Sequence, residues 1–336
     1  MLDERKVAEA GSARAMFARM VRPLVISVAV CLAIYIASVI LGDYDRIVAA
    51  MARIGVGGWA AILAMSLLNY ALRFVRWHWY IAVLSVRVPA VPNFWIYLSA
   101  FAFATTPGKA GEAVRSLYLL PYGVPVSSSL AAFLIERFMD LVAIMALSSL
   151  AAIHFEESRW VVVLAAAATA LLFAIYRGTW ALRVIETVAR SVRSPRVAAL
   201  LDGLHRFQRD AGVLLRGRLF AGALGLGLLA WAAEGLGFVL TLRYLGVDAP
   251  ALLLVGIYSV SILAGALSFI PGGIGSTEAV MGLLLVLVGV DTSTAVAATI
   301  VCRLATLWFA VAVGMGCLGV IELRGRARQS GLERAR

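Results

Sequence analysis

Long apolar runs recur along the whole of this 336-residue chain, and they constrain its fold more than any other feature. A run of about 18 or more apolar residues is long enough to cross a hydrocarbon core of ~30 Å as a helix. Only 15% of the residues are charged, whereas ordinary soluble domains contain ~25%. The sequence therefore predicts an integral membrane protein and excludes a water-soluble enzyme, a DNA-binding protein and a disordered tail.

Eight apolar stretches define the predicted architecture. Six are predicted to be full crossings, at residues 24–41, 59–84, 127–153, 159–176, 218–245 and 294–321. Two further stretches, 93–122 and 251–289, are each broken by Pro-Gly in the middle. The predicted fold class is an all-α polytopic membrane protein.

Basic residues indicate the sidedness of the loops. Segments 1–23, 177–217 and 322–336 hold five, eight and five basic residues, which the positive-inside rule places in the cytoplasm. The external loops are then 42–58, 154–159, 246–250 and 290–293, which together hold three arginines and six acids. These assignments work only if each broken stretch enters and leaves the membrane on one face, so both are predicted to be re-entrant hairpins.

The two halves of the chain match each other at the breaks. Pro107-Gly108-Lys109-Ala110-Gly111 and Pro271-Gly272-Gly273-Ile274-Gly275 share the same spacing, Glu112 then aligns with Glu278, and Arg137 aligns with Arg303. The predicted halves are 24–153 and 159–321, with opposite orientations. Inverted repeats with broken helices are typical of transporters, because unwound backbone is tolerated at depth only where it lines a cavity. The alternative is a pair of kinks that let helices pack closely.

Charged residues inside the apolar stretches are the candidate site. Each costs about 2.5–3.5 kcal/mol at a helix centre unless it is paired or solvated. Glu136, Arg137 and Asp140 lie on one helix, where residues three and four apart share a face. They predict either an ion pair between helices or a phosphate ligand, Arg137, that the acids orient. Arg303 has Cys302 where Arg137 has Glu136, so it is predicted to lack a neutralising acid and to suit an anion.

The first break combines charge with a predicted helix start. Lys109 and Arg115 flank Glu112, and a half-helix beginning near Gly111 would direct free N–H groups and its positive end at a lipid phosphate. Glu112 and Glu278 could hold a cationic headgroup, accept a coupling proton, neutralise nearby bases or cap a helix. The candidate hinge residues are Pro107, Gly108, Gly111, Pro271, Gly272, Gly273 and Gly275.

Two other regions have simpler interpretations. Arg73, Arg76, Trp77 and Trp79 are predicted to end the second crossing at the cytoplasmic face by snorkelling and by forming an aromatic belt. The alternative, as second choice, is an entrance for a lipid headgroup. Apolar residues at helical spacing within 182–192 predict either a cytoplasmic helix on anionic lipid or an arginine-rich connector that only fixes the topology. No spacing of histidine or cysteine predicts a metal site, and no cofactor is expected.

Four motifs in order resemble the lysylphosphatidylglycerol synthase transmembrane-region family over about residues 20–322. They are Leu72-Arg73-Phe74-Val75-Arg76-Trp77, Pro107 to Arg115, Glu136-Arg137-Phe138-Met139-Asp140 and Pro271 to Glu278. The resemblance, to the flippase domain of the multiple peptide resistance factor, implies a bacterial inner-membrane lipid flippase and not an enzyme. With about 15 residues after the last span, a synthase domain is not expected.

Three functions are compatible with these features. The first is transport of a polar lipid headgroup, and the resemblance implies an anionic or aminoacylated phospholipid, a hopanoid or a polyprenyl-linked lipid. The second is a non-transporting scaffold for a lipid-modifying enzyme, docked through the loop 177–217 and the basic tails. The third is a membrane-embedded transferase with Glu112 or Glu278 as base. Nucleic acid is not an expected partner.

Overall fold

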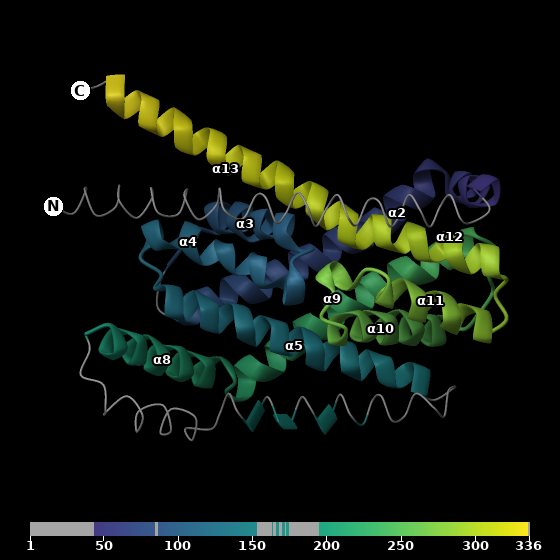
Figure 1. Cartoon of the computed structure of the whole chain (residues 1–336), viewed down its shortest axis with the longest axis horizontal. Coiled ribbons are helices and arrows are strands. Elements are labelled where there is room, and N and C mark those ends of the chain that lie inside the picture. The colour runs from purple at the N-terminus through teal and green to yellow at the C-terminus, as the bar shows by residue number, and fades with distance from the viewer. Residues whose placement is uncertain are drawn as a thin grey trace.

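The computed structural model describes residues 44–84, 87–152 and 195–334, together with isolated positions between 163 and 174. This part of the chain is helical and contains no strands, in agreement with the predicted all-α class. The helices form an elongated bundle, and most of them run along its long axis (Figure 1). The predicted crossing 24–41 and the tail 1–23 lie outside the described residues, as does most of the crossing 159–176.

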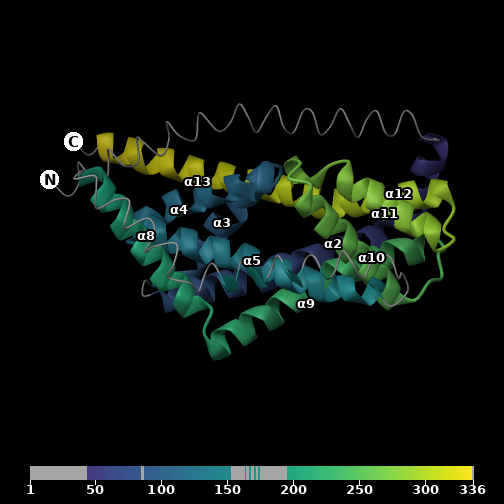
Figure 2. The same ribbon diagram turned by 60° about the horizontal axis from the view of Figure 1, so that its bottom comes forward.

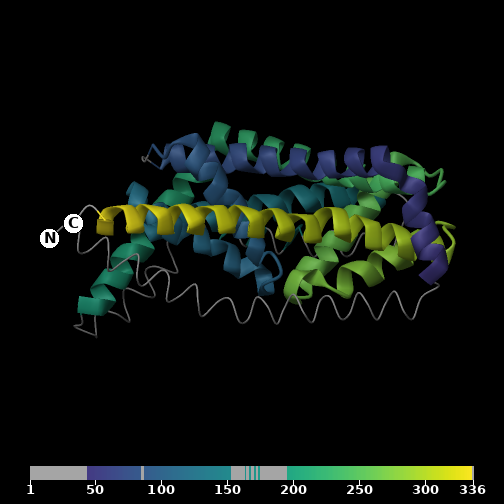
Figure 3. The same cartoon turned by 90° about the horizontal axis from the view of Figure 1, so that it is seen from above.

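Three helical stretches among the described residues are long and apolar enough to cross a membrane: Met51–Val83, Gly217–Tyr244 and Thr292–Leu323. The first belongs to α2 (Tyr44–Val83), which bends at Gly55, where φ is 63°. The second is α9 (Gly217–Tyr244). The third runs through α12 (Thr292–Arg303), a π-helical turn (Leu304–Trp308) and the start of α13 (Phe309–Arg334). Helix α13 extends along the length of the bundle (Figure 3).

Two segments predicted to lie outside the membrane are helical. Helix α2 begins at Tyr44, within the predicted external loop 42–58, and only Gly55 leaves helical geometry there. Helix α13 continues to Arg334, through most of the predicted tail 322–336. The predicted crossing 127–153 corresponds to α5 (Val126–Ala152), whose 27 residues would span about 40 Å at 1.5 Å per residue.

Both Pro-Gly stretches fold as helical hairpins whose arms contact each other. The first consists of α3 (Ala90–Ser99), η1 (Ala100–Phe103), η2 (Pro107–Val114), α4 (Arg115–Leu119) and η3 (Leu120–Tyr122). The second consists of α10 (Ala251–Leu267), η4 (Pro271–Gly273) and α11 (Ser276–Leu287). The first hairpin lies at one end of the bundle and the second at the other (Figures 1 and 2), while η2 contacts η4 between them. The two breaks therefore meet inside the molecule.

Close helix packing surrounds these hairpins. A β-carbon added to Gly256 on α10 would collide with the backbone of Ala151 on α5. One added to Gly314 on α13 would collide with the backbone of Ala102 in η1. Small residues at such contacts let helix backbones approach closely, as is common in membrane proteins.

One further helix leaves the main direction of the bundle. Helix α8 (Pro195–Leu214) lies across one end of the molecule and packs on α5 (Figure 2). The Ser128 hydroxyl on α5 donates to the buried Asp210 carboxylate on α8 at 2.5 Å. The helix predicted over 182–192 falls outside the described residues.

Candidate functional site

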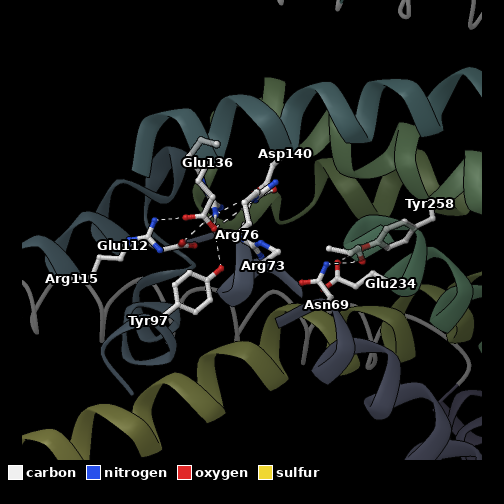
Figure 4. Close-up of polar contacts among 12 residues, drawn as sticks. Asn69, Arg73, Arg76, Tyr97, Glu112, Arg115, Glu136, Asp140, Glu234 and Tyr258 are labelled. Carbon is white, nitrogen blue, oxygen red and sulfur yellow. Dashed lines mark hydrogen bonds and ion pairs between the residues drawn. The ribbon is translucent and has the colours of Figure 1, made fainter. Parts of the chain in front are cut away.

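Seven charged side chains converge inside the bundle beside the first break, and Figure 4 shows six of them labelled. Helix α2 contributes Arg73 and Arg76, and η2 and α4 contribute Glu112 and Arg115. Helix α5 contributes Glu136, Arg137 and Asp140. We call these seven residues the arginine cluster. The prediction that Glu136 and Asp140 share one helix face with Arg137 near Asp140 is confirmed, because Arg137 Nη2 lies 3.1 Å from Asp140 Oδ2.

Glu136 lies at the centre of the arginine cluster, and its side chain is fully buried. Its carboxylate accepts hydrogen bonds from Arg115 at 2.5 Å and from Arg137 at 3.1 Å. Two more guanidinium groups, those of Arg73 and Arg76, lie 3.7 Å away. The hydroxyl of Tyr97 also donates to Glu136 at 2.9 Å. Burying a charge is costly unless it is paired and hydrogen-bonded, and Glu136 meets both conditions.

Asp140 binds two of the arginines of α2. Arg76 Nη2 donates to Asp140 Oδ1 at 2.5 Å, and Arg73 Nη2 lies 3.3 Å from Oδ2. The predicted snorkelling of Arg73 and Arg76 is therefore wrong, since both side chains are buried in the bundle. Sequence reasoning missed them because a snorkelling arginine and a buried one look the same at the end of an apolar run. The signal that could have found them is that the acids on α5 need more positive charge than Arg137 supplies.

Trp77 was likewise misassigned to an interfacial belt. It is fully buried, and the Arg115 guanidinium carbon lies 3.7 Å from its ring centroid. Tyr97 and Phe133 also lie within cation–π distance of Arg115. Trp79, by contrast, is 37% exposed, in keeping with the predicted belt. Aromatic rings and Glu136 thus hold Arg115 in place from several sides.

Arg137 is the most accessible member of the arginine cluster. Its side chain is 17% exposed, whereas the other members are at most 6% exposed. Arg137 Nη1 lies 3.7 Å from Glu112 Oε2, so this arginine connects the acids of α5 to the first break. A ligand that enters the arginine cluster would meet Arg137 first.

The arginine cluster has more hydrogen-bond donors than acceptors. Within the described part of the chain, seven buried guanidinium nitrogens have no hydrogen-bond partner: Nε and Nη2 of Arg73, Nε and Nη1 of Arg76 and of Arg115, and Nε of Arg137. Of these, Arg73 Nη2 forms an ion pair with Asp140 Oδ2 at 3.3 Å. Two carboxylate oxygens of the arginine cluster, Glu112 Oε2 and Asp140 Oδ2, also have no hydrogen-bond partner. Four guanidinium groups also face three carboxylates, which leaves a formal charge of +1. Buried donors need an explanation, and arginine is the side chain best suited to phosphate oxygens.

The backbone at the first break differs from the expectation. The half-helix was predicted to begin near Gly111, but η2 begins at Pro107, directly after the extended Thr106. The Gly111 N–H is occupied, because it donates to Thr106 Oγ1 at 2.8 Å. A proline can start a helix because the N–H that it lacks would be unpaired there anyway. Pro107, Gly108 and Gly111 therefore lie inside a tight helix, and the Lys109 side chain lies outside what the structure describes.

At the second break, the predicted hinge glycines do form the break. Gly272, Gly273 and Gly275 have φ values of 65°, 65° and 87°. This left-handed region favours glycine because other residues place a β-carbon too close to the backbone. Helix α11 begins immediately afterwards at Ser276.

Glu278 and Arg303 form a separate pair at the second break. Arg303 Nε donates to Glu278 Oε1 at 2.7 Å, and Arg303 Nη2 donates to the Gly272 carbonyl at 2.5 Å. Glu278 Oε2 accepts from the Gly275 N–H at 2.7 Å, so the helix-capping alternative for this residue is confirmed. The expectation that Arg303 lacks a neutralising acid is wrong. Its partner comes from α11 rather than from its own helix, which local sequence does not reveal.

A third polar group lies between these two sites. Glu234 on α9 is buried and accepts a hydrogen bond from the Tyr258 hydroxyl on α10 at 2.6 Å (Figure 4). Glu234 interacts electrostatically with Tyr70 on α2, which also interacts with Arg73. Tyr258 in turn interacts with Arg303. Buried polar groups thus run from the arginine cluster through Glu234 toward the Glu278–Arg303 pair.

Long apolar helices, paired broken hairpins and charges buried between them define a polytopic helical membrane protein. Its family is given by sequence comparison: residues 23–314 match the profile described as the lysylphosphatidylglycerol synthase TM region. The chain belongs to that family, as the four motifs predict.

Several curated relatives are similar over most of the chain. A UPF0104 membrane protein of Methanothermobacter thermautotrophicus is 29% identical over 275 residues, which cover 75% of this chain and 81% of the relative. A second protein of that name and organism is 25% identical and covers 62% and 68%. A UPF0104 membrane protein of Pyrococcus horikoshii is 25% identical and covers 75% and 82%. These names support a membrane protein and specify no substrate.

Proposed function

We propose that this protein moves a phosphate-bearing lipid headgroup across the cytoplasmic membrane while the acyl chains stay in the bilayer. The observation that carries the proposal is the arginine cluster, which has a formal charge of +1 and seven buried nitrogens without a hydrogen-bond partner among the described residues. A lipid phosphodiester carries one negative charge and two free oxygens, so it matches the charge and can accept hydrogen bonds from some of these donors. Membership of a family named for a lipid-related membrane region supports the same substrate class.

The arrangement of the hairpins supports an inverted-repeat transporter. The hairpins come from opposite ends of the bundle, and their breaks make contact through η2 and η4 (Figure 1). In such transporters, substrate sites lie near the midplane where discontinuous helices meet. We infer that the headgroup passes between the two halves at this meeting point. The basic residues near both chain termini favour a cytoplasmic location for them.

Arg137 is the residue through which the proposal is best tested. The purified protein is reconstituted into vesicles that contain fluorescent phosphatidylglycerol, and transfer between leaflets is followed by dithionite quenching. Arg137→Ala should slow transfer at least ten-fold, because a charge-assisted hydrogen bond contributes about 1.5–3 kcal/mol. Arg137→Lys should retain part of the rate. Arg53→Ala removes an exposed arginine of α2 and should leave the rate unchanged.

Two results would defeat the proposal. The first is transfer by the wild-type protein no faster than in protein-free vesicles, for phosphatidylglycerol and aminoacylated lipids alike. The second is equal rates for Arg137→Ala and the wild-type protein. Circular dichroism and size-exclusion profiles of each variant distinguish lost transfer from lost folding.

A non-transporting scaffold for a lipid-modifying enzyme is the second candidate, and α8 is the observation that favours it. This helix lies at one end of the bundle, and its exposed side chains include Asp202, His205, Arg206 and Arg209. A scaffold predicts that Arg206→Glu with Arg209→Glu abolishes function in cells while Arg137→Ala is tolerated. Transport predicts the reverse.

A further inference from the structure

Two buried polar atoms lie one helical turn apart on the side of α2 that packs against α9. They belong to Asn69 and Arg73, which are four residues apart and therefore share one helix face. Asn69 is fully buried, and Arg73 is 4% exposed. Among the residues that the structure describes, Asn69 Oδ1 and Arg73 Nε have no hydrogen-bond partner. One is an acceptor and the other a donor, and buried atoms of this kind need an explanation.

The contact between Asn69 and α9 fixes the orientation of its amide group. Asn69 Nδ2 donates to the Ala230 carbonyl at 2.8 Å, and a carbonyl oxygen can only accept a hydrogen bond. A flipped amide would lose this bond and bring two carbonyl oxygens together. Figure 4 shows Asn69 beside Arg73, on the side away from Glu112 and Arg115. The unpaired atom of Asn69 is therefore an acceptor at the edge of the arginine cluster.

Arg73 connects this position to the arginine cluster. Its Nη2 lies 3.3 Å from Asp140 Oδ2 and 3.7 Å from Glu136 Oε1, both on α5. Its Nε is the guanidinium nitrogen nearest to its own helix, on which Asn69 lies. The rings of Phe101 and Trp231 flank the guanidinium group, with centroids 5.5 and 5.7 Å from its central carbon. Arg73 thus belongs to the arginine cluster at one end and adjoins Asn69 at the other.

The chemistry of the two atoms favours a hydroxyl group as their shared partner. Asn69 Oδ1 needs a donor and Arg73 Nε needs an acceptor, and a hydroxyl group is both in a single atom. A phosphate oxygen only accepts, so it leaves Asn69 Oδ1 unpaired. An ammonium group only donates, so it leaves Arg73 Nε unpaired and places two positive charges together.

We propose that Asn69 and Arg73 form a subsite for a hydroxyl group of the lipid headgroup. The protein then selects a phospholipid whose phosphate carries a hydroxylated alcohol, such as glycerol or a sugar, over one that carries ethanolamine. The inference rests on the proposed function, in which the arginine cluster binds the lipid phosphate, and adds a selectivity for the alcohol attached to that phosphate. The rings of Phe101 and Trp231 provide apolar contact for the carbons of the alcohol.

The test compares lipids that differ only in their hydroxyl groups. Dihexanoylphosphatidylglycerol and dihexanoylphosphatidylpropanol have the same charge and the same number of headgroup carbons, but the propanol lipid has no headgroup hydroxyl. Each is titrated into the full-length protein in an uncharged maltoside detergent, and calorimetry measures the affinity. We expect the wild-type protein to bind the glycerol lipid about ten-fold more tightly, because a hydrogen bond to a charged group is lost with the hydroxyl. Dihexanoylphosphatidylethanolamine should also bind more weakly than the glycerol lipid.

Asn69→Leu removes the acceptor and keeps a side chain of similar size. This variant should lower the affinity for the glycerol lipid about three- to ten-fold and leave the affinity for the propanol lipid unchanged, which also shows that the variant is folded. Ser66→Ala is the matched control. Ser66 is buried one turn earlier on α2, and its hydroxyl donates to the Ala305 carbonyl at 2.8 Å, as the Asn69 amide does to Ala230. Ser66→Ala should keep the wild-type preference for the glycerol lipid.

The outcomes separate the subsite from the proposed function. Equal affinities of the wild-type protein for the glycerol and propanol lipids would overturn the subsite, because water alone would then occupy it, and would leave the phosphate site standing. An equal loss of affinity for both lipids in Asn69→Leu would overturn it too, because Asn69 would then only support the arginine cluster. Binding of glycerol 3-phosphate as tight as that of the glycerol lipid would assign the site to a soluble phosphate ester. No binding of any lipid would defeat the proposed function together with the subsite.

Discussion

The two breaks share one sequence motif but use it differently. At the first, Pro107 starts a tight helix, and the charged residues around it join a group of four arginines and three acids. At the second, three glycines with left-handed backbone conformation form the break. One glutamate and one arginine bind each other there, and the glutamate also accepts from the backbone of the break. Glu278 and Arg303 therefore bind the backbone of the second break. The arginine cluster, in contrast, has a net positive charge and guanidinium nitrogens without a hydrogen-bond partner. Residues that align in a repeat need not share a role.

The largest expected difference between the two breaks is the loss of stability when the central acid of each is removed. Glu136→Ala leaves four guanidinium groups without their shared partner, and losing one side of a buried pair costs about 3–5 kcal/mol. Glu278 is 19% exposed and binds one arginine, so Glu278→Ala should cost about 1–2 kcal/mol. Thermal unfolding in detergent measures both. Equal losses would remove the distinction between the two regions.

The backbone of the second break should be more sensitive than an ordinary helical glycine. Gly273 has a φ of 65°, and an added β-carbon would lie 2.8 Å from Thr277 Oγ1. Gly273→Ala should cost about 1–2 kcal/mol from the left-handed conformation alone. Gly282 on α11 has open space around it, so Gly282→Ala should change stability by less than about 1 kcal/mol and in the stabilising direction. A Gly273→Ala protein as stable as Gly282→Ala would show that this break carries no strain.

The first break depends on a hydroxyl rather than on glycine conformation. Thr106 Oγ1 accepts from the Gly111 N–H at 2.8 Å and donates to the Phe103 carbonyl at 2.7 Å. Thr106→Val keeps the shape and removes both bonds, which should cost about 1 kcal/mol. Hydrogen exchange at the Gly111 amide should accelerate while α11 stays protected. Unchanged exchange would mean that the hydroxyl does not hold the Gly111 N–H.

The sequence alone determined the features that depend on local spacing. The apolar runs predicted the ends of α5 and α9 to within one residue, because length and hydrophobicity suffice to define a buried helix. Pro-Gly motifs marked both hairpins, and a spacing of four placed Glu136 and Asp140 on one face. The four motifs also identified the family.

Tertiary structure decided which charges meet. Arg76 binds Asp140 across 64 residues, and Arg303 binds Glu278 across 25, so neither pair follows from helical periodicity. At the end of an apolar run, an arginine is equally able to reach water or to turn inward, and only the packing of α2 on α5 and α9 turns Arg73 and Arg76 inward. Local sequence fixes what a helix must bury. The neighbouring helices fix which partner each buried charge finds, because that depends on contacts between distant parts of the chain.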